Sequence, residues 1–519
     1  MGVAPVGRTV ANSQVWLRRI LPTIILIAVT KNTTPPQIRD AVKIHHQVTI
    51  SYDAAKRAKK HLIGDDLEGQ ASQFQLLPAY ADAIRSADPN TRVVLSIEKR
   101  DGTQRFQRIF ICPGISRSAF QHSRHMIAMN GTFTKDIFCL TILLAACVDA
   151  DNHAVPLAWA VVESENEHAW RFFLSNLYNA IPEINRPTTT VISDRDKGLC
   201  AADNEIPLAA RAFCAEHLSR NLQKNFGMPS RSIFNSSIRF ALTEERLQAG
   251  FTELEGFSPQ AVNYLRQIDL ALWATPRFTG KRYGHNTSNI VEILNNWIVE
   301  ERKLSIIDLL HALWSKVMDL RFRRLQEAEK YLDGAVTTKY SAKKLEVSMN
   351  FSNHQLIRYA DPLHASVLSM MGKWYVVDLE ARTCTCGHFQ YDDIPCGHAV
   401  AVIQAYRCPD GALARRSARD FVAYNLTLAA FRATYNGPAM PPIEIATLTP
   451  HEDEPCRPPL FKKARGRPQT ARLTAGEQRA RLAAYNGVLE NIPDRVQRCS
   501  RCGEEGHNVT RCPVLPAGL

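Results

Sequence analysis

The sequence has no hydrophobic run long enough to cross a membrane. Its longest apolar run near the N-terminus, Ile20 to Val29, has ten residues and contains a proline, whereas a spanning helix needs about 20. No small-residue cleavage site follows this run, so we interpret it as a buried helix and not as a signal peptide. We therefore expect an intracellular protein without a membrane partner.

The sequence also lacks internal repeats and the cysteine pattern of a disulfide scaffold. Six of the 13 cysteines lie in two short segments that also contain histidine, which indicates metal sites in a reducing compartment. The net charge of +12 and the pI of about 9.1 favour an anionic partner, with nucleic acid ahead of a membrane surface.

A chain of 519 residues is too long for a single core, so we expect several domains. Between residues 125 and 300 the pattern predicts a strand, two apolar strands joined by a polar turn, a helix, and a strand that ends at Asp194, which together form an α/β sheet with a crossover helix. The other segments that we predict are an N-terminal α+β module at 17–120, a helical region at 301–365, a Cys/His module at 366–410, a proline-rich basic linker at 436–495 and a second Cys/His module at 496–515.

The C-terminal cluster has the spacing C-x2-C-x4-H-x4-C, with the ligands Cys499, Cys502, His507 and Cys512. Three thiolates and one imidazole make a tetrahedral Zn²⁺ site, and so short a peptide has no core without the ion. The spacing is that of a CCHC zinc knuckle, which predicts a contact with single-stranded nucleic acid. No aromatic residue lies inside the loop, so a protein contact stays open.

The other cluster has the spacing C-x-C-x9-C-x-H, with the ligands Cys384, Cys386, Cys396 and His398. The first two sulfurs would lie on one side of a strand or hairpin, and the last two ligands would lie at the start of a helix. His388 is a competing ligand, and a buried cysteine-rich hairpin is the alternative without metal. The pattern resembles the SWIM zinc finger, whose members contact DNA or protein.

Between the clusters, Arg465, Gly466, Arg467 and Pro468 resemble the core of an AT-hook, which inserts arginines into a narrow minor groove. A nuclear-import patch and a solvated linker explain the same residues equally well. From 457 to 512 there are 12 Lys and Arg against 5 Asp and Glu. This excess predicts an arm that binds phosphate groups.

The block NGTFTKDIFCLTILLAACVDADNHAVPLAWAVVESENEHAWRFFLSNL, followed by VISDRDKGL and CAEHLSRN, resembles the Mutator-like (MULE) transposases. Many plant-type members carry a SWIM finger, a GRP stretch and a zinc knuckle in the same order. The resemblance implies a ribonuclease H-like core over 125–300 with a helical insertion at about 215–285, accompanied by small zinc-binding modules. It further implies DNA as the partner and a nuclear location, and a homo-oligomer is compatible with it.

The family uses a D-D-E triad that holds two divalent ions, Mg²⁺ or Mn²⁺, for phosphoryl transfer. The resemblance places the second aspartate at Asp194, for which a helix N-cap is the alternative role. It places the glutamate at Glu292, in the first turn of a helix capped by Ser288 or Asn289, with Glu300 or Glu301 as alternatives.

Cys214 and His217 match the family's Cys-x-x-His motif and would share one helix face. Packing or positioning beside the active site is as good an interpretation of this pair as metal binding.

The first aspartate of the triad falls on Asn130. Taken alone, Asn130-Gly131 predicts a hairpin turn, but the resemblance places Asn130 at the end of a strand, as a metal ligand. An amide can coordinate a cation but brings no negative charge, and neither Asp136 nor Asp149 replaces it by position. We therefore expect impaired catalysis, and keep two alternatives: a host-adopted, non-catalytic DNA-binding or transcription regulator, and a SWIM-mediated protein-interaction module.

Overall fold

The computed structural model describes residues 33–459, except 47–48, 63–66, 101, 207, 209, 333, 353–355, 407–415 and 452–454. The predicted zinc knuckle and the GRP stretch lie outside the described residues. None of the helices in these ranges is both long enough and apolar enough to span a bilayer.

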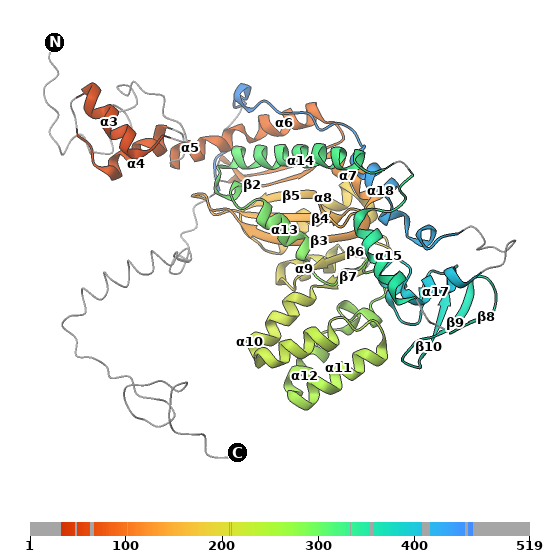
Figure 1. The fold of residues 1–519 in the computed structure, drawn as a ribbon. Coiled ribbons are helices and arrows are strands. Elements are labelled where there is room, and N and C mark those ends of the chain that lie inside the picture. The colour runs from red at the N-terminus through yellow and green to blue at the C-terminus, as the bar shows by residue number, and fades with distance from the viewer. Residues whose placement is uncertain are drawn as a thin grey trace, which may run out of the picture. The chain divides into compact units, whose positions relative to one another are not determined.

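A seven-stranded mixed sheet has the order β1-β2-β5-β4-β3-β6-β7 (Figure 1). The strands from β1 to β3 in this order pair antiparallel, whereas β6 pairs parallel with both β3 and β7. Their bounds are β1 Arg92–Arg100, β2 Thr103–Cys112, β3 Arg124–Phe133, β4 Thr141–Val148, β5 Ala154–Val162, β6 Thr190–Ser193 and β7 Ala210–Phe213.

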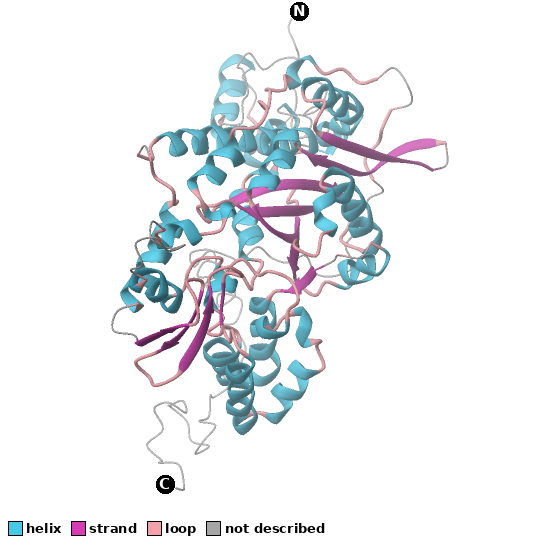
Figure 2. Ribbon diagram, turned by 90° about the vertical axis from the view of Figure 1, so that its right-hand side faces the viewer, coloured by secondary structure: helices cyan, strands magenta, loops and turns pink. Residues whose placement is uncertain are grey.

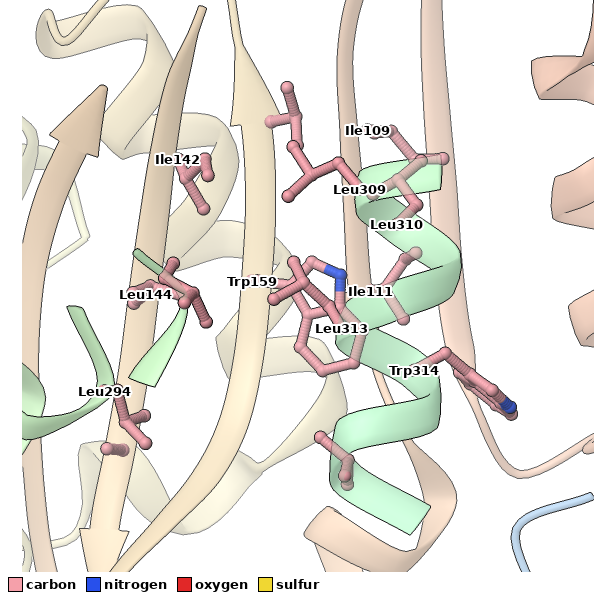
Figure 3. Close-up of a cluster of buried hydrophobic side chains, with 14 of the residues drawn as sticks. Ile109, Ile111, Ile142, Leu144, Trp159, Leu294, Leu309, Leu310, Leu313 and Trp314 are labelled. Atoms are coloured by element: carbon pink, nitrogen blue, oxygen red, sulfur yellow. The ribbon is translucent and has the colours of Figure 1, made fainter. Parts of the chain in front are cut away.

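The central strands are apolar along their whole length because helices cover both faces of the sheet. On one face, Ile142, Leu144 and Trp159 meet the leucines of α14, among them Leu310 and Leu313 (Figure 3). On the other face, alternate residues of the same strands pack against α7, α8 and α18. The sheet is thus a rigid support for side chains at its edges.

The helices before and around the sheet are α3 Pro35–His46, α4 Tyr52–Leu62, α5 Leu67–Ser72, α6 Leu77–Ala87, α7 Gly114–His122, α8 Glu167–Ala180 and α9 Lys197–Glu205. After β7 come α10 Ala215–Ile233, α11 Glu244–Phe257 and α12 Pro259–Arg266, which share a hydrophobic core of their own. The chain then returns to the large sheet with α13 Asn289–Trp297 and α14 Ile306–Glu329.

A second, four-stranded antiparallel sheet has the order β11-β10-β9-β8 (Figure 2). Its strands are β8 Leu356–Tyr359, β9 His364–Leu368, β10 Trp374–Asp378 and β11 Thr383–Cys384, and the neighbouring helices are α15 Lys339–Phe351, α16 His388–Asp392, α17 Gly397–Ala405 and α18 Leu428–Tyr435. The last part of the segment that we predicted to be helical, 301–365, therefore contains β8 and the start of β9.

The structure corrects our prediction for the strand that carries Asn130. Asn130 is neither a hairpin turn nor the end of its strand, because β3 continues to Phe133. Asn130 pairs with Leu144 of β4, and Gly131 pairs with Leu143. The Asn-Gly turn preference is overridden here by ladder pairing with an entirely buried strand.

Candidate functional site

Asp194 directly follows β6, at the carboxyl end of a buried strand. The helix-capping role that we considered for Asp194 belongs to Asp196, whose carboxylate accepts the N–H of Leu199 at 3.0 Å. Among the hydrogen bonds of the described residues, the carboxylate of Asp194 accepts only the N–H of Asp196, at 3.2 Å. Burial raises the pKa of the Asp194 carboxyl, and this bond acts against the rise.

Glu292 lies in the first turn of α13, with Ser288 at the N-cap position. Its carboxylate is half-buried and lies 3.8 Å from the guanidinium of Arg220 on α10. The alternative ligands Glu300 and Glu301 form ion pairs with Lys303 and Lys316. Of the three glutamates, only Glu292 shares with Asp194 a described side chain whose pKa both carboxylates raise.

This side chain belongs to His217. A hydrogen bond with Cys214 raises the pKa of the His217 imidazole against the effect of burial, and the charges of Asp194 and Glu292 act in the same direction. The imidazole is therefore close enough to interact with both carboxylates. The structure thus brings Asp194, Glu292, Cys214 and His217 into one site.

Cys214 is the point where the three segments of this site are joined. Its N–H donates to the carbonyl of Ser193 at 2.8 Å, and its sulfur accepts the N–H of Ser288 at 3.2 Å. The next N–H, of Ala215, donates to Asn286 at 2.8 Å. The strand that ends at Asp194 and the helix that carries Glu292 are therefore both held by the start of α10.

An open cavity of about 670 Å³ reaches this site. Asp194, Asp196 and His217 line one end of it, and Gln267 and Asp269 of the helical segment line the other. Arg195 bridges the two sides, since its guanidinium donates to the hydroxyl of Tyr264 at 2.5 Å. The cavity is large enough for a phosphate group together with part of a nucleotide.

Asn130 lies at the same end of the sheet and offers an amide oxygen in place of a carboxylate. Its side-chain oxygen accepts the N–H of Gly131 at 2.9 Å. Because Met126 and Ala128 face α13 and α14, the strand alternation puts Asn130 on the same face as Glu292. Position 130 thus belongs to the site but contributes no charge.

Glu165 is the residue of this site that sequence reasoning missed. It lies between the end of β5 and the start of α8. Burial, together with the nearby charges of Asp196 and Asp194, raises the pKa of its carboxyl to about 7. A glutamate between a buried strand and a helix N-cap, in VVESENEHAW, was the available signal.

The second candidate site is the Cys/His cluster of the smaller sheet. The candidate ligand atoms of Cys384, Cys386, Cys396 and His398 all lie within 4.8 Å of one another. The sulfur of Cys384 is 3.7 Å from Nδ1 of His398, and ligands around tetrahedral zinc lie roughly 3.5–3.8 Å apart. Cys396 is the N-cap residue of α17, as the spacing predicted.

Two features prepare this cluster for a cation. Hydrogen bonds from the thiols of Cys384 and Cys396 lower the pKa of Cys386. The imidazole of His398 stacks on the ring of Tyr375 at a centroid distance of 4.1 Å, which fixes its orientation. His388, the competing ligand, begins α16 and does not belong to this group of four.

Comparison with known proteins gives two family matches. Residues 126–221 match the MULE transposase domain, and residues 375–407 match the SWIM zinc finger. A transposase for insertion sequence element IS905 of Lactococcus lactis subsp. lactis (strain IL1403) is 23% identical over 197 residues, which are 36% of this chain and 48% of that protein. The chain thus spans about half the length of the curated relative it matches.

These matches show a region similar to transposases in the part of the chain that contains Asp194. More particularly, the chain combines a MULE transposase domain with a SWIM zinc finger whose four predicted ligands lie together. The MULE match includes Asn130, Glu165, Asp194, Cys214 and His217 and ends before Glu292.

Proposed function

We propose that the chain is a zinc-binding and DNA-binding protein whose larger sheet is a ribonuclease H-like core for divalent-ion-dependent DNA strand cleavage and transfer, at a rate lowered by Asn130. The order β5-β4-β3-β6-β7 supports the fold assignment, because three antiparallel strands are followed by two parallel ones. The helices α10 to α12 would be the insertion.

The observation that carries this proposal is that the start of α10 is hydrogen-bonded both to the strand before Asp194 and to the helix start before Glu292. The charges of both carboxylates raise the pKa of His217 on this helix. The two carboxylates are 98 positions apart in the sequence, and the hydrogen bonds of Cys214 and Ala215 hold their segments together. Carboxylate oxygens are the ligands that Mg²⁺ and Mn²⁺ prefer, so the donor set fits such ions.

The residues of the chain have distinct tasks in this chemistry. Asp194 and Glu292 would hold the divalent ions, which when bound activate the attacking oxygen and stabilise the leaving oxygen. Arg220, which is half-exposed beside Glu292, can pair with a DNA phosphate and orient the strand. Cys214 positions Glu292 through the N-cap of α13.

The SWIM cluster has a different task. Three sulfurs and one imidazole suit Zn²⁺ and do not suit Mg²⁺. The four ligands complete a tetrahedral set, so zinc bound there would be structural and would leave no open position for substrate.

A host-adopted regulator without catalysis is the second candidate. It is favoured by the amide at position 130, which brings no negative charge to a site for divalent ions and whose oxygen already accepts the N–H of Gly131.

The test is a DNA nicking assay with Mg²⁺ or Mn²⁺. We expect weak cleavage by the protein, at least a tenfold gain in Asn130→Asp, and loss in Asp194→Asn; removal of a metal ligand typically costs tenfold or more. Asp361→Asn, a change at an exposed aspartate paired with His364 in the smaller-sheet region, is the matched control and should cleave like the unchanged protein. Absence of cleavage in both the unchanged protein and Asn130→Asp would contradict the proposed activity and leave the regulator.

A further inference from the structure

The backbone brings the segment of Glu165 close to two other segments, one at Gly131 in β3 and one at Gly198 after Asp194. A Cβ atom at Gly131 would lie 2.7 Å from both carboxylate oxygens of Glu165. A Cβ atom at Gly198 would lie 2.7 Å from the backbone of Asn166. Glycine on each side therefore lets β3 and the first turn of α9 approach the segment that carries Glu165.

The carboxylate of Glu165 is poorly compensated in this position. Buried carboxylates elsewhere in the chain are satisfied by donors: Asp149 accepts two backbone N–H groups and the hydroxyl of Tyr435 at 2.8 Å. Among the described residues, the only donor that bears on Glu165 is the indole of Trp170. A half-buried carboxylate beside Asp194 and Asp196, with so few donors, is stabilised in its charged form by a bound cation.

Trp170 is a second observation that points to the same place. Its ring is fully buried, and its indole N–H has no hydrogen-bond partner of ordinary geometry among the described residues. The N–H nevertheless lies near enough to Glu165 to lower the pKa of that carboxyl. A buried donor directed at a carboxylate holds it in place without neutralising it.

The last feature of this site is the number of carboxylates that can supply negative charge to it. Position 130 offers an amide whose oxygen accepts the N–H of Gly131, whereas the Glu165 carboxylate lies where a side chain at position 131 would begin. The strand alternation puts Gly131 on the α8 face of the sheet, so Glu165 approaches the edge from the side opposite α13. The site can thus hold three carboxylates without an aspartate at position 130.

We propose that Glu165 is a further carboxylate ligand of the divalent-ion site and supplies the negative charge that Asn130 does not provide. This inference rests on the proposed function, because it assigns Glu165 to the same site. It makes Gly131 a residue selected for close approach and not for a turn. It also gives the chain a reason to retain activity without an aspartate at position 130.

The test measures Mn²⁺ binding to the full, zinc-loaded protein without DNA, by the electron paramagnetic resonance signal of free Mn²⁺. We expect Glu165→Gln to weaken binding at least tenfold and Glu163→Gln to leave it unchanged. Glu163 is a matched control because it is exposed and only two residues away. Binding by Glu165→Gln within twofold of the unchanged protein would overturn the inference.

A double variant tests whether Glu165 stands in for the missing aspartate. If it does, Asn130→Asp will restore Mn²⁺ binding and DNA nicking in the Glu165→Gln background. Lack of rescue, with both single variants folded by their melting temperatures, would overturn this role.

Failure of the inference is distinguishable from failure of the proposed function. Asp194→Asn must abolish Mn²⁺ binding and nicking if the site is catalytic at all. When Asp194→Asn is defective and Glu165→Gln is not, the catalytic site stands and only the role of Glu165 falls. When neither change affects Mn²⁺ binding, both proposals fall.

Discussion

The two candidate metal sites differ in how far apart their ligands lie in the sequence and in whether the set of ligands is complete. The SWIM cluster takes four ligands from 15 consecutive positions, 384 to 398, and brings them within 4.8 Å of one another. The acidic edge takes Asn130, Glu165, Asp194 and Glu292 from four separate elements. The first site is a complete ligand set on one small module, whereas the second depends on the whole sheet.

The two sites also differ in how their ligands affect one another's pKa. Thiols share protons through hydrogen bonds among themselves, which lowers the pKa of Cys386 and leaves a compact group before any ion binds. Burial, and after it the charges of neighbouring carboxylates, raises the pKa of both Glu165 and Asp194. A structural metal site can therefore be closed and local, while a catalytic one stays open to a cavity and under electrostatic strain.

The largest effect should follow from removing one ligand of the SWIM cluster. Cys396→Ser is expected to lower the zinc content from about two ions per chain to about one and to unfold the smaller sheet, because metal binding supplies folding free energy on the order of 10 kcal/mol in such modules. Zinc analysis by mass spectrometry and thermal melting measure this.

Cys139→Ser is the control for that change, because Cys139 is exposed and lies outside the cluster. It should keep both its zinc and its melting temperature. Full zinc content in Cys396→Ser would show that the four-ligand assignment is wrong.

A change at Gly131 should lower the affinity for Mn²⁺ while it leaves the free energy of unfolding almost unchanged. In Gly131→Ala the new Cβ must displace the Glu165 carboxylate, which is the far end of a flexible side chain. We expect the free energy of unfolding to change by less than about 1 kcal/mol while Mn²⁺ affinity falls roughly tenfold. Urea unfolding and Mn²⁺ titration measure the two quantities.

Gly256→Ala is the matched control, since a Cβ at this position on α11 meets no atom within 4 Å. It should bind Mn²⁺ normally. Normal Mn²⁺ binding by Gly131→Ala would argue that Glu165 does not need its observed position.

The contrast between the sites also explains what the sequence could predict. The SWIM ligands follow from spacing alone, because a strand and the next helix start fix them locally. Asp194 and Glu292 required a family resemblance, because nothing in the periodicity tells which sheet edge will meet α13. The place of Asn130 within β3 was missed because an Asn-Gly pair normally ends a strand, and here the pairing with buried β4 continues to Phe133.

Glu165 was missed for a different physical reason. Its role depends on two close backbone approaches, at Gly131 and Gly198, and these become visible only after three segments are assembled. In the sequence both glycines look like ordinary turn or helix-start residues. The helix-capping role of Asp196 was considered as the alternative role of Asp194, two positions earlier, because cap positions are predicted only to within one or two residues.

The smallest effect on metal binding should come from Cys214. This cysteine has a histidine three positions later but is not proposed as a zinc ligand. Cys214→Ala removes the acceptor for the buried N–H of Ser288, which should cost about 1–3 kcal/mol and lower nicking by loosening the helix that carries Glu292. Zinc content should not change. Cys112→Ala, at a fully buried cysteine of β2, controls for lost packing and should leave nicking intact. Loss of zinc from Cys214→Ala would contradict this comparison. Cys214 would then be a zinc ligand, and the site of Asp194 and Glu292 would be a Cys/His metal site as well.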